Sequence, residues 1–220
     1  MRVEALKTHL GIDRTALLVV DVQNDFCHPN GALARAGKDV SHIQRMIPRL
    51  LDFIQEARRA GLPIIYLKTE NDSWTRHRAL VSQQLAGRRE TLCLAGSWGA
   101  EFYRVAPARD ERVIVKRRYS GFVNTDLDLV LRARGIRTLI MTGVASNVCV
   151  ESTARDGFMR GYSIVFLSDC TAATDPDEHR AALRNIEQYF GLVVSSETII
   201  RFWRSEKTGA RCGEEAEPER

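Results

Sequence analysis

The chain has 220 residues, of which 44% are hydrophobic and 27% are charged, and its formal net charge is +4. This composition fits one large domain with a substantial core, and the spread of Lys and Arg along the chain argues against nucleic-acid binding. No apolar run approaches the roughly 20 residues of a membrane span, and the N-terminus lacks the apolar centre of a signal peptide.

Two features concern domain organisation and compartment. We expect one domain over residues 1–205 and a disordered tail over 206–220, because the tail is charged and lacks periodicity. The chain has five cysteines, an odd number, and no Cys-x-x-Cys pair. A disulfide framework is therefore not indicated, and we expect free thiols in a reducing, cytoplasmic setting.

The N-terminal half predicts two strands separated by a helix. Residues 16–22 form a continuous, β-branched-rich run, which is typical of a strand buried on both faces. Residues 41–60 have apolar positions at helical spacing, and residues 63–67 predict the second strand. Residues 68–95 break the pattern except for one helix expected near 76–85, so we expect loops around a site there.

The C-terminal half continues the alternation of strands and helices. Strands are expected at 112–116, 137–141, 163–167 and 192–194, and helices at 125–135, from Cys149 to 161, at 176–191 and at 198–203. Alternating strands and helices predict right-handed crossovers and a parallel sheet. The predicted fold is a three-layer α/β/α, Rossmann-like domain with a six-stranded parallel sheet and helices on both faces.

Chemically capable residues follow three of these strands: Asp21, Lys116 and Cys149. Ligands of open α/β sheets bind at the carboxyl ends of the strands, so these side chains can converge. A Lys116 cation would lower the pKa of the Cys149 thiol, and Asp21 could accept its proton and pass it to a leaving amine. Backbone N–H groups of Ala145 and Cys149 could hold an oxyanion. The alternatives are a structural cysteine and a turn-capping aspartate.

The same residues resemble a known family. Asp21-x-Gln-x-x-Phe26, then Lys116, then Gly143-Val-Ala-Ser-Asn-Val-Cys149-Val are similar in order and context to the isochorismatase-like cysteine hydrolases. The resemblance covers roughly residues 14–203. It implies an Asp–Lys–Cys triad, a thioester intermediate and a cis peptide bond between Val144 and Ala145. It also implies a homo-oligomer, a dimer or tetramer, without an organic cofactor.

The resemblance also bears on metal and substrate. The metal-binding members carry an Asp-x-His…His pattern, whereas His77 stands without it, so no metal is expected. The resemblance implies a small-molecule substrate, a linear amide or ureide. Biuret, triuret and N-carbamoyl amino acids stay open as alternatives, as do a redox-responsive thiol protein and a catalytically idle binding protein. Whether Arg118 or the loop 68–98 binds a substrate carboxylate is also open.

Aromatic and amide side chains near the three motifs are candidate substrate contacts. They are Phe26, Asn24, Asn71, Trp74, Trp98, Tyr119 and Phe122. Each could instead pack in the core or satisfy turn backbone. Elsewhere, Glu151 and Arg155 have the i, i+4 spacing of a helix-surface pair, Asp169 is expected to cap, and His179 is expected only to begin a helix.

Overall fold

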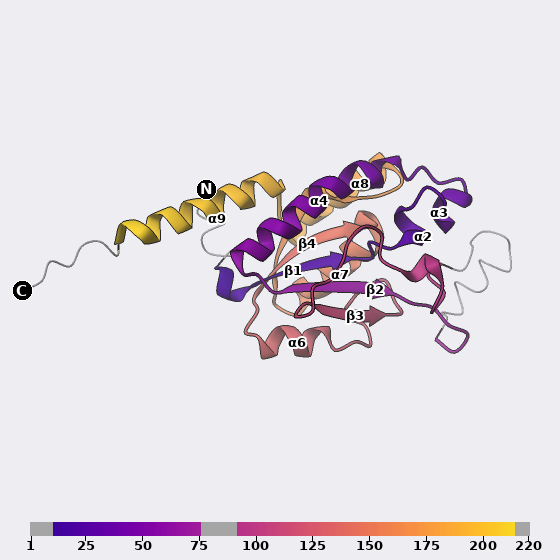
Figure 1. The fold of residues 1–220 in the computed structure, drawn as a ribbon, viewed down its shortest axis with the longest axis horizontal. Helices are drawn as coiled ribbons and strands as arrows, with labels where there is room; N and C mark the ends of the chain where they lie inside the picture. Colours follow the sequence, from indigo (N-terminus) through magenta and orange to yellow (C-terminus); the bar gives the residue numbers. More distant parts are fainter. Residues whose placement is uncertain (1–10, 76–91, 214–220) are drawn as a thin grey trace, which may run out of the picture.

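The computed structural model describes residues 11–75 and 92–213, with side chains described up to residue 205 (Figure 1). In this part of the chain, six parallel strands form one sheet in the order β3-β2-β1-β4-β5-β6. The strands are β1 (Thr15–Val20), β2 (Ile64–Thr69), β3 (Arg112–Lys116), β4 (Thr138–Val144), β5 (Ser163–Ala172) and β6 (Gly191–Val194). The strand order reverses between β1 and β4, which confirms the predicted doubly wound architecture.

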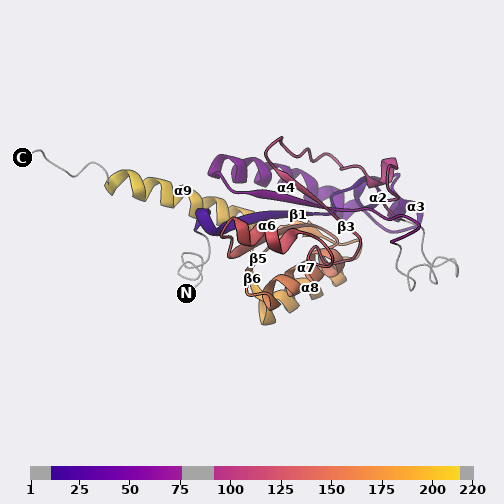
Figure 2. The same cartoon turned by 90° about the horizontal axis from the view of Figure 1, so that it is seen from below.

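Helices cover both faces of this sheet (Figure 2). The longer ones are α4 (Ser41–Ala60), α6 (Leu127–Ala133), α7 (Glu151–Met159), α8 (Pro176–Tyr189) and α9 (Ser196–Gly213). Short turns are α2 (Asn24–Cys27), α3 (Ala32–Arg35), the 3-10 turns η1 (Ile12–Arg14) and η2 (Trp98–Ala100), and the π-type turn η3 (Ser146–Val150). Helices α4 and α9 lie on one face, whereas α6, α7 and α8 lie on the other. The three expected layers are therefore present.

Strand β1 is the centre of the sheet and is buried on both faces, as its apolar run predicts. Leu17 and Val19 pack on the side of α4, and Leu18 and Val20 pack on the side of α6 and α7. Successive side chains of a strand point to opposite faces, so one run of aliphatic residues serves both cores. Because β1 is held from both sides, the residue that follows it has a fixed position.

Helix α4 confirms the predicted amphipathic helix at 41–60. Its buried residues recur at helical spacing: Ile43, Met46, Ile47, Leu50, Phe53, Ile54 and Ala57. Burying each large apolar side chain stabilises the fold by roughly 1.5–3 kcal/mol. The helix ends at Gly61, whose φ of 79° is a left-handed cap that glycine adopts without steric cost.

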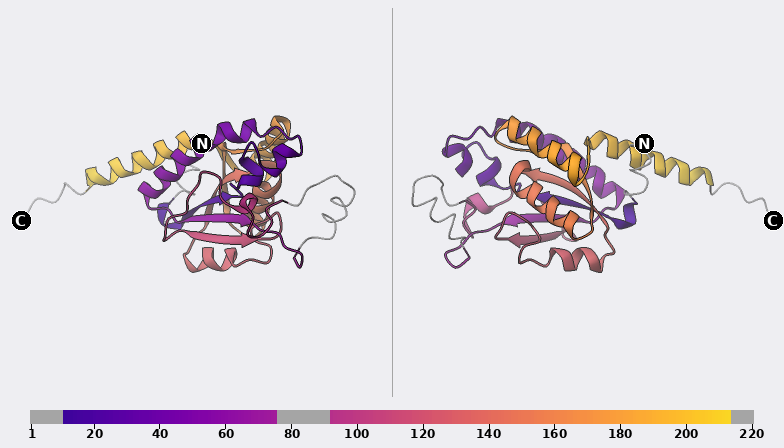
Figure 3. Two further views of the ribbon diagram at one scale, coloured as in Figure 1. Left: turned by 45° about the vertical axis from the view of Figure 1, so that its right-hand side comes forward. Right: turned by 180° about the vertical axis from the view of Figure 1, so that it is seen from behind.

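Helix α9 extends past residue 205, where the tail was expected to begin, and the disorder expected for the tail stays a prediction. The helix continues to Gly213, and residues 214–220 lie outside the described part of the chain. Its first turns are anchored, since Trp203 stacks on Phe53 of α4 with ring centroids 5.5 Å apart. An Arg201–Glu197 pair at i, i+4 adds local support. Beyond these anchored turns, the helix extends away from the sheet (Figure 3).

Two further expectations concern the ends of elements. Asp169 lies within β5, which is longer than predicted, and it caps α9 by accepting hydrogen bonds from the Ser196 N–H at 2.8 Å and hydroxyl at 2.7 Å. The predicted helix near 76–85 and the N-terminal residues 1–10 lie outside the described residues. Within the described part of the chain, no helix is long and apolar enough to cross a lipid bilayer.

Candidate active site

Four neighbouring strand ends supply the site. Lys116 ends β3, Thr69 ends β2, Asp21 follows β1, and Cys149 lies in η3 just after β4. Because these strands are adjacent in the order β3-β2-β1-β4, the four residues follow one another along one edge of the sheet. Parallel strands place their carboxyl ends at the same edge, where α/β proteins bind ligands.

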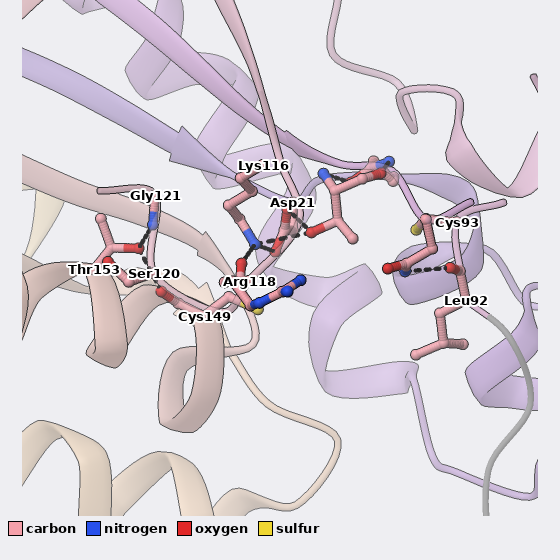
Figure 4. A network of polar contacts seen from close by, with 12 residues as sticks. Asp21, Leu92, Cys93, Lys116, Arg118, Ser120, Gly121, Cys149 and Thr153 are labelled. Atoms are coloured by element: carbon pink, nitrogen blue, oxygen red, sulfur yellow. Dashed lines mark hydrogen bonds and ion pairs between the residues drawn. The ribbon is translucent and has the colours of Figure 1, made fainter. Parts of the chain in front are cut away.

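A buried ion pair lies at the centre of this edge (Figure 4). Lys116 Nζ is 2.7 Å from Asp21 Oδ2, and both side chains are at most 1% exposed. The Thr69 hydroxyl joins the two partners, because it donates to Asp21 Oδ1 at 2.9 Å and accepts from Lys116 Nζ at 2.8 Å. Lys116 also donates to the main-chain carbonyl of Arg118 at 3.1 Å. A buried pair with this many hydrogen bonds is fixed in geometry.

The backbone of Asp21 turns sharply out of β1. Its φ of 51° lies in the left-handed region, which a short polar residue tolerates better than most others. The Asp21 N–H donates to the Leu67 carbonyl at 2.9 Å, and the Gln23 N–H donates to the Asp21 carbonyl at 2.8 Å. These bonds on either side of the residue hold its carboxylate toward Lys116.

The Cys149 thiol is buried beside this pair, and it is a thiol rather than a thiolate at neutral pH. Burial raises its pKa to about 12; the Lys116 charge opposes this shift, and Asp21 adds to it. Lys116 lowers the pKa of the thiol, as the sequence predicts. This lowering is smaller than the combined rise, because both burial and the neighbouring carboxylate disfavour a thiolate. Attack by Cys149 therefore needs a base, and the Asp21 carboxylate, whose charge acts on the thiol, is available beside it.

Lys116 keeps its proton in the same surroundings. Burial alone would lower the pKa of Lys116, but the Asp21 charge raises it, and the net shift is upward. An ammonium group that is buried and paired in this way acts as a fixed positive charge rather than a proton donor. The site therefore combines one cation, one base and one nucleophile.

The segment that carries Cys149 follows a tightly packed turn. Gly143 in β4 has a φ of 101°, and a Cβ atom there would lie 2.1 Å from the Val20 carbonyl oxygen, so only glycine fits. The next bond, Val144–Ala145, is cis, as the family resemblance implies. The main chain then enters η3, where the N–H groups of Val148 and Val150 donate to the Ala145 carbonyl. The oxyanion role of the Ala145 and Cys149 N–H groups stays a prediction.

Two contacts to the site were not predicted from the sequence. Thr69 has no motif, and only its place at a strand end marks it. His179 was expected to be without a functional partner, but its Nδ1 lies 2.9 Å from the hydroxyl of the buried Ser146. Burial lowers the pKa of His179 and favours the neutral ring, whose Nδ1 shares a hydrogen bond with the Ser146 hydroxyl. His179 thus holds the segment next to the nucleophile.

The predicted amide contacts point to backbone. Asn24 donates from Nδ2 to the Trp98 carbonyl at 2.8 Å, and Asn71 donates from Nδ2 to the Leu92 carbonyl at 2.8 Å. These bonds fix the loop that lies near the site. The amide N–H groups that make them are already hydrogen-bonded to main-chain carbonyls. The alternative weighed for both residues, that they satisfy turn backbone, is therefore the one the contacts favour.

The predicted aromatic contacts are dispersed. Phe122 is buried and stacks on Tyr162 with centroids 5.8 Å apart, which favours the core-packing alternative, and its role as a substrate contact stays a prediction. Trp74 is 95% exposed, Trp98 is 45% exposed and packs edge-on against His28, Tyr119 is 43% exposed, and Phe26 packs partly buried against the core. The role of these five rings as substrate contacts stays a prediction.

Two other predictions concern ion pairs and metals. Arg155 pairs with Glu151 at 2.6 Å on α7, as the i, i+4 spacing predicts. Across the residues that the structure describes, no group of three His, Cys, Asp or Glu side chains is placed to hold a metal ion. The four described cysteines are free and buried, and desolvation raises the pKa values of Cys27, Cys93 and Cys170 as well.

Comparison with known proteins gives consistent matches over most of the chain. The model of the isochorismatase domain matches residues 15–198. A ureidoacrylate amidohydrolase RutB from Methylobacterium radiotolerans is 44% identical over 194 residues, which are 81% of this chain and 75% of that protein. A protein of the same name from Azorhizobium caulinodans is 37% identical over 211 residues, covering 89% and 92% of the two chains.

Solved structures agree with these sequence matches. The crystal structure of a cysteine hydrolase from Pseudomonas syringae pv. phaseolicola superimposes with a TM-score of 0.73 at 35% identity, and the match covers 89% of this chain and 95% of that one. An identity of this size over nearly the whole length indicates a shared fold.

Proposed function

The chain belongs to the isochorismatase family, and on that premise we propose that it is a cysteine-dependent amidohydrolase of small linear amides. One observation carries the proposal: a buried Lys116–Asp21 ion pair at 2.7 Å lies beside the Cys149 thiol at the carboxyl edge of the sheet. A nucleophile, a base and a fixed cation in contact are what acyl transfer from an amide requires. The enzyme acts on carbon–nitrogen bonds other than peptide bonds.

We derive the reaction from the protonation states at rest. Cys149 Sγ attacks the carbonyl carbon as its proton passes to the Asp21 carboxylate, which removes the need for a free thiolate. The carbonyl oxygen becomes an oxyanion, which the N–H groups of Ala145 and Cys149 hold. The C–N bond breaks as Asp21 returns the proton to the leaving nitrogen. A thioester on Cys149 and ammonia or an amine result.

The second half of the reaction reverses these roles. Asp21, again a carboxylate, takes a proton from a water molecule that attacks the thioester carbonyl. The tetrahedral intermediate collapses, the C–S bond breaks and the proton returns to sulfur, so the acid leaves and the thiol is restored. Lys116 stays protonated throughout and stabilises the negative charge that moves between Asp21 and Cys149.

The substrate we propose is a ureido compound related to ureidoacrylate. The support is the name of the relatives, which are 37–44% identical over most of the chain. Biuret, triuret and N-carbamoyl amino acids are the alternatives within the same chemistry. A redox-responsive thiol is less well supported, since sensor cysteines need a lowered pKa and the pKa of Cys149 is raised.

We also propose that the chain assembles as a homo-oligomer, a dimer or tetramer, and works in the reducing cytoplasm. The family resemblance supports the assembly, and four buried free thiols among the described residues support the reducing setting. Light scattering on the purified protein tests the first proposal. A monomeric mass at micromolar concentration would contradict it.

Ammonia release from a panel of small amides tests the activity. The panel contains ureidoacrylate, biuret, triuret, N-carbamoylsarcosine, maleamate and nicotinamide. We expect turnover of a ureide by the wild type and none by Cys149→Ser, because a hydroxyl is far less acidic than the thiol it replaces. Cys170→Ser is the matched control, since that thiol is buried on β5 away from the site. Hydrolysis that survives in Cys149→Ser would refute the mechanism.

A further inference from the structure

Arg118 differs from the other charged side chains near the triad in its lack of an ion pair within the described part of the chain. Three ion pairs lie along this edge of the sheet: Lys116–Asp21 at 2.7 Å, Lys68–Glu70 at 2.8 Å and Arg117–Asp72 at 3.6 Å. Arg118, two residues beyond the buried lysine, has no carboxylate within ion-pair distance among the described residues. Within that part of the chain, no carboxylate neutralises the charge of Arg118.

Arg118 is tied to the triad through its backbone. Its main-chain carbonyl accepts from Lys116 Nζ at 3.1 Å, so any movement of the residue would disturb the catalytic cation. The side chain is half-buried. In the view of Figure 4 its guanidinium group is drawn beside Cys149, on the side that faces the loop of Cys93. Both side chains therefore belong to the same edge of the sheet, since Arg118 follows Lys116 at the end of β3 and Cys149 follows β4.

The hydrogen bonds of the guanidinium group leave one edge open. Nη1 donates to the Thr75 carbonyl at 3.0 Å and to the Arg117 carbonyl at 2.7 Å, and these bonds orient the plane of the group. The Nε and Nη2 donors make no hydrogen bond to the described residues. These two N–H groups are parallel and lie on the same edge, which is the arrangement that binds both oxygens of one carboxylate.

We infer that Arg118 binds a carboxylate of the substrate through this open edge, so that the enzyme selects anionic amides. The inference rests on the proposed function and narrows it. Substrates with a ureido or carbamoyl group at one end and a carboxylate at the other fit the site, as ureidoacrylate and N-carbamoyl amino acids do. Biuret and triuret, which are neutral, leave the guanidinium edge unpaired and are disfavoured.

Paired substrates that differ only in charge test this inference. Steady-state kinetics are measured on ureidoacrylate and on its methyl ester, with wild type, Arg118→Gln, Arg118→Lys and the control Arg117→Gln. For Arg118→Gln we expect kcat/KM to fall about 10- to 100-fold on the acid, mainly through KM, and less than about threefold on the ester. Arg118→Lys should recover only part of the loss, because an ammonium group lacks the fork.

The control isolates the role of Arg118 from general changes in charge. Arg117 is exposed and already paired with Asp72, so Arg117→Gln removes the same charge one residue away and should change neither substrate by more than about twofold. An equal loss on acid and ester in Arg118→Gln would overturn the inference. So would wild-type turnover of biuret as efficient as that of ureidoacrylate.

A second measurement separates this inference from the proposed function. Cys149 is alkylated with anionic iodoacetate or with neutral iodoacetamide, and the modified peptide is quantified by mass spectrometry. Arg118→Gln should lower the iodoacetate-to-iodoacetamide rate ratio at Cys149 about tenfold, whereas Arg117→Gln should keep it. An unchanged ratio in Arg118→Gln refutes the anion site. If the wild type hydrolyses no ureide, the proposed function is refuted. The ratio of iodoacetate to iodoacetamide rates at Cys149 still decides whether Arg118 binds an anion.

Discussion

Replacing Asp21 by Asn separates the reactivity of the thiol from turnover. In the wild type the pKa of Cys149 is raised to about 12, so only about one molecule in 10⁵ carries a thiolate at pH 7. Asp21 contributes to that rise through its negative charge, while Lys116 opposes it. Asp21→Asn removes this raising contribution and keeps the lowering one. The thiol of the variant is therefore more acidic.

The same variant loses the base, so activity and acidity move in opposite directions. General-base assistance contributes about 10²- to 10⁴-fold, and we expect kcat to fall by at least that range. The thiolate is followed by its absorbance near 240 nm during a pH titration, and turnover by ammonia release. A variant with a lower Cys149 pKa and near-normal kcat would refute the role of Asp21 as the base. An unchanged pKa would refute the electrostatic argument.

Stability must be controlled, because Asp21→Asn leaves a buried ammonium group unpaired. Removing one partner of a buried pair costs about 3–5 kcal/mol, and urea denaturation should show a loss of that size. The double variant Asp21→Asn/Lys116→Met removes both charges and should recover most of the lost stability. It should still be inactive. If the double variant were as unstable as the single one, the unpaired charge would not be the cause.

Three further changes probe other parts of the site and core. Thr69→Val removes the hydroxyl between the paired charges at nearly constant volume. We expect kcat to fall about tenfold and the urea midpoint to shift little. An unchanged kcat would show that the Thr69 hydroxyl does not contribute to catalysis. Phe122→Ala should destabilise by about 3–5 kcal/mol with KM unaltered, and a rise in KM without loss of stability would restore Phe122 as a substrate contact. Burial raises the pKa values of the thiols above those of the unfolded chain. The free energy of unfolding should therefore be greatest below about pH 9 and fall as pH rises toward the pKa values of the folded state. Urea titrations at pH 7, 9 and 10 that show no fall in this free energy would contradict the argument.

Much of the fold could be predicted because its signals are local. The aliphatic run of β1 and the amphipathic spacing of α4 each require only their own residues, and both elements form as expected. The convergence of Asp21, Lys116 and Cys149 followed from one topological rule, that parallel strands end at a common edge. This rule predicts that the three residues lie near one another, and the 2.7 Å distance between Lys116 Nζ and Asp21 Oδ2 agrees with it.

What could not be predicted depends on which strands are neighbours and on net electrostatics. Thr69 bridges Lys116 and Asp21 only because β2 lies between β3 and β1, and strand order is not encoded in any short motif. The pKa of Cys149 has opposing contributions, and their balance depends on burial, which the sequence does not supply. His179 finds Ser146 across 33 residues of chain, so spacing alone gives no signal.

The position of β1 between β2 and β4 has a consequence for how activity appears during refolding. Asp21 meets Thr69 across β1 and β2, and it meets Cys149 across β1 and β4, pairings that join residues far apart in the sequence. Sheets built from such contacts form slowly, because long loops must close before the contacts stabilise them. A sheet that lacks β1, β2, β3 or β4 does not contain the whole reacting set, whereas β5 and β6 supply none of its four residues. The recovery of hydrolysis is thus a reporter of the last of these four strands to dock.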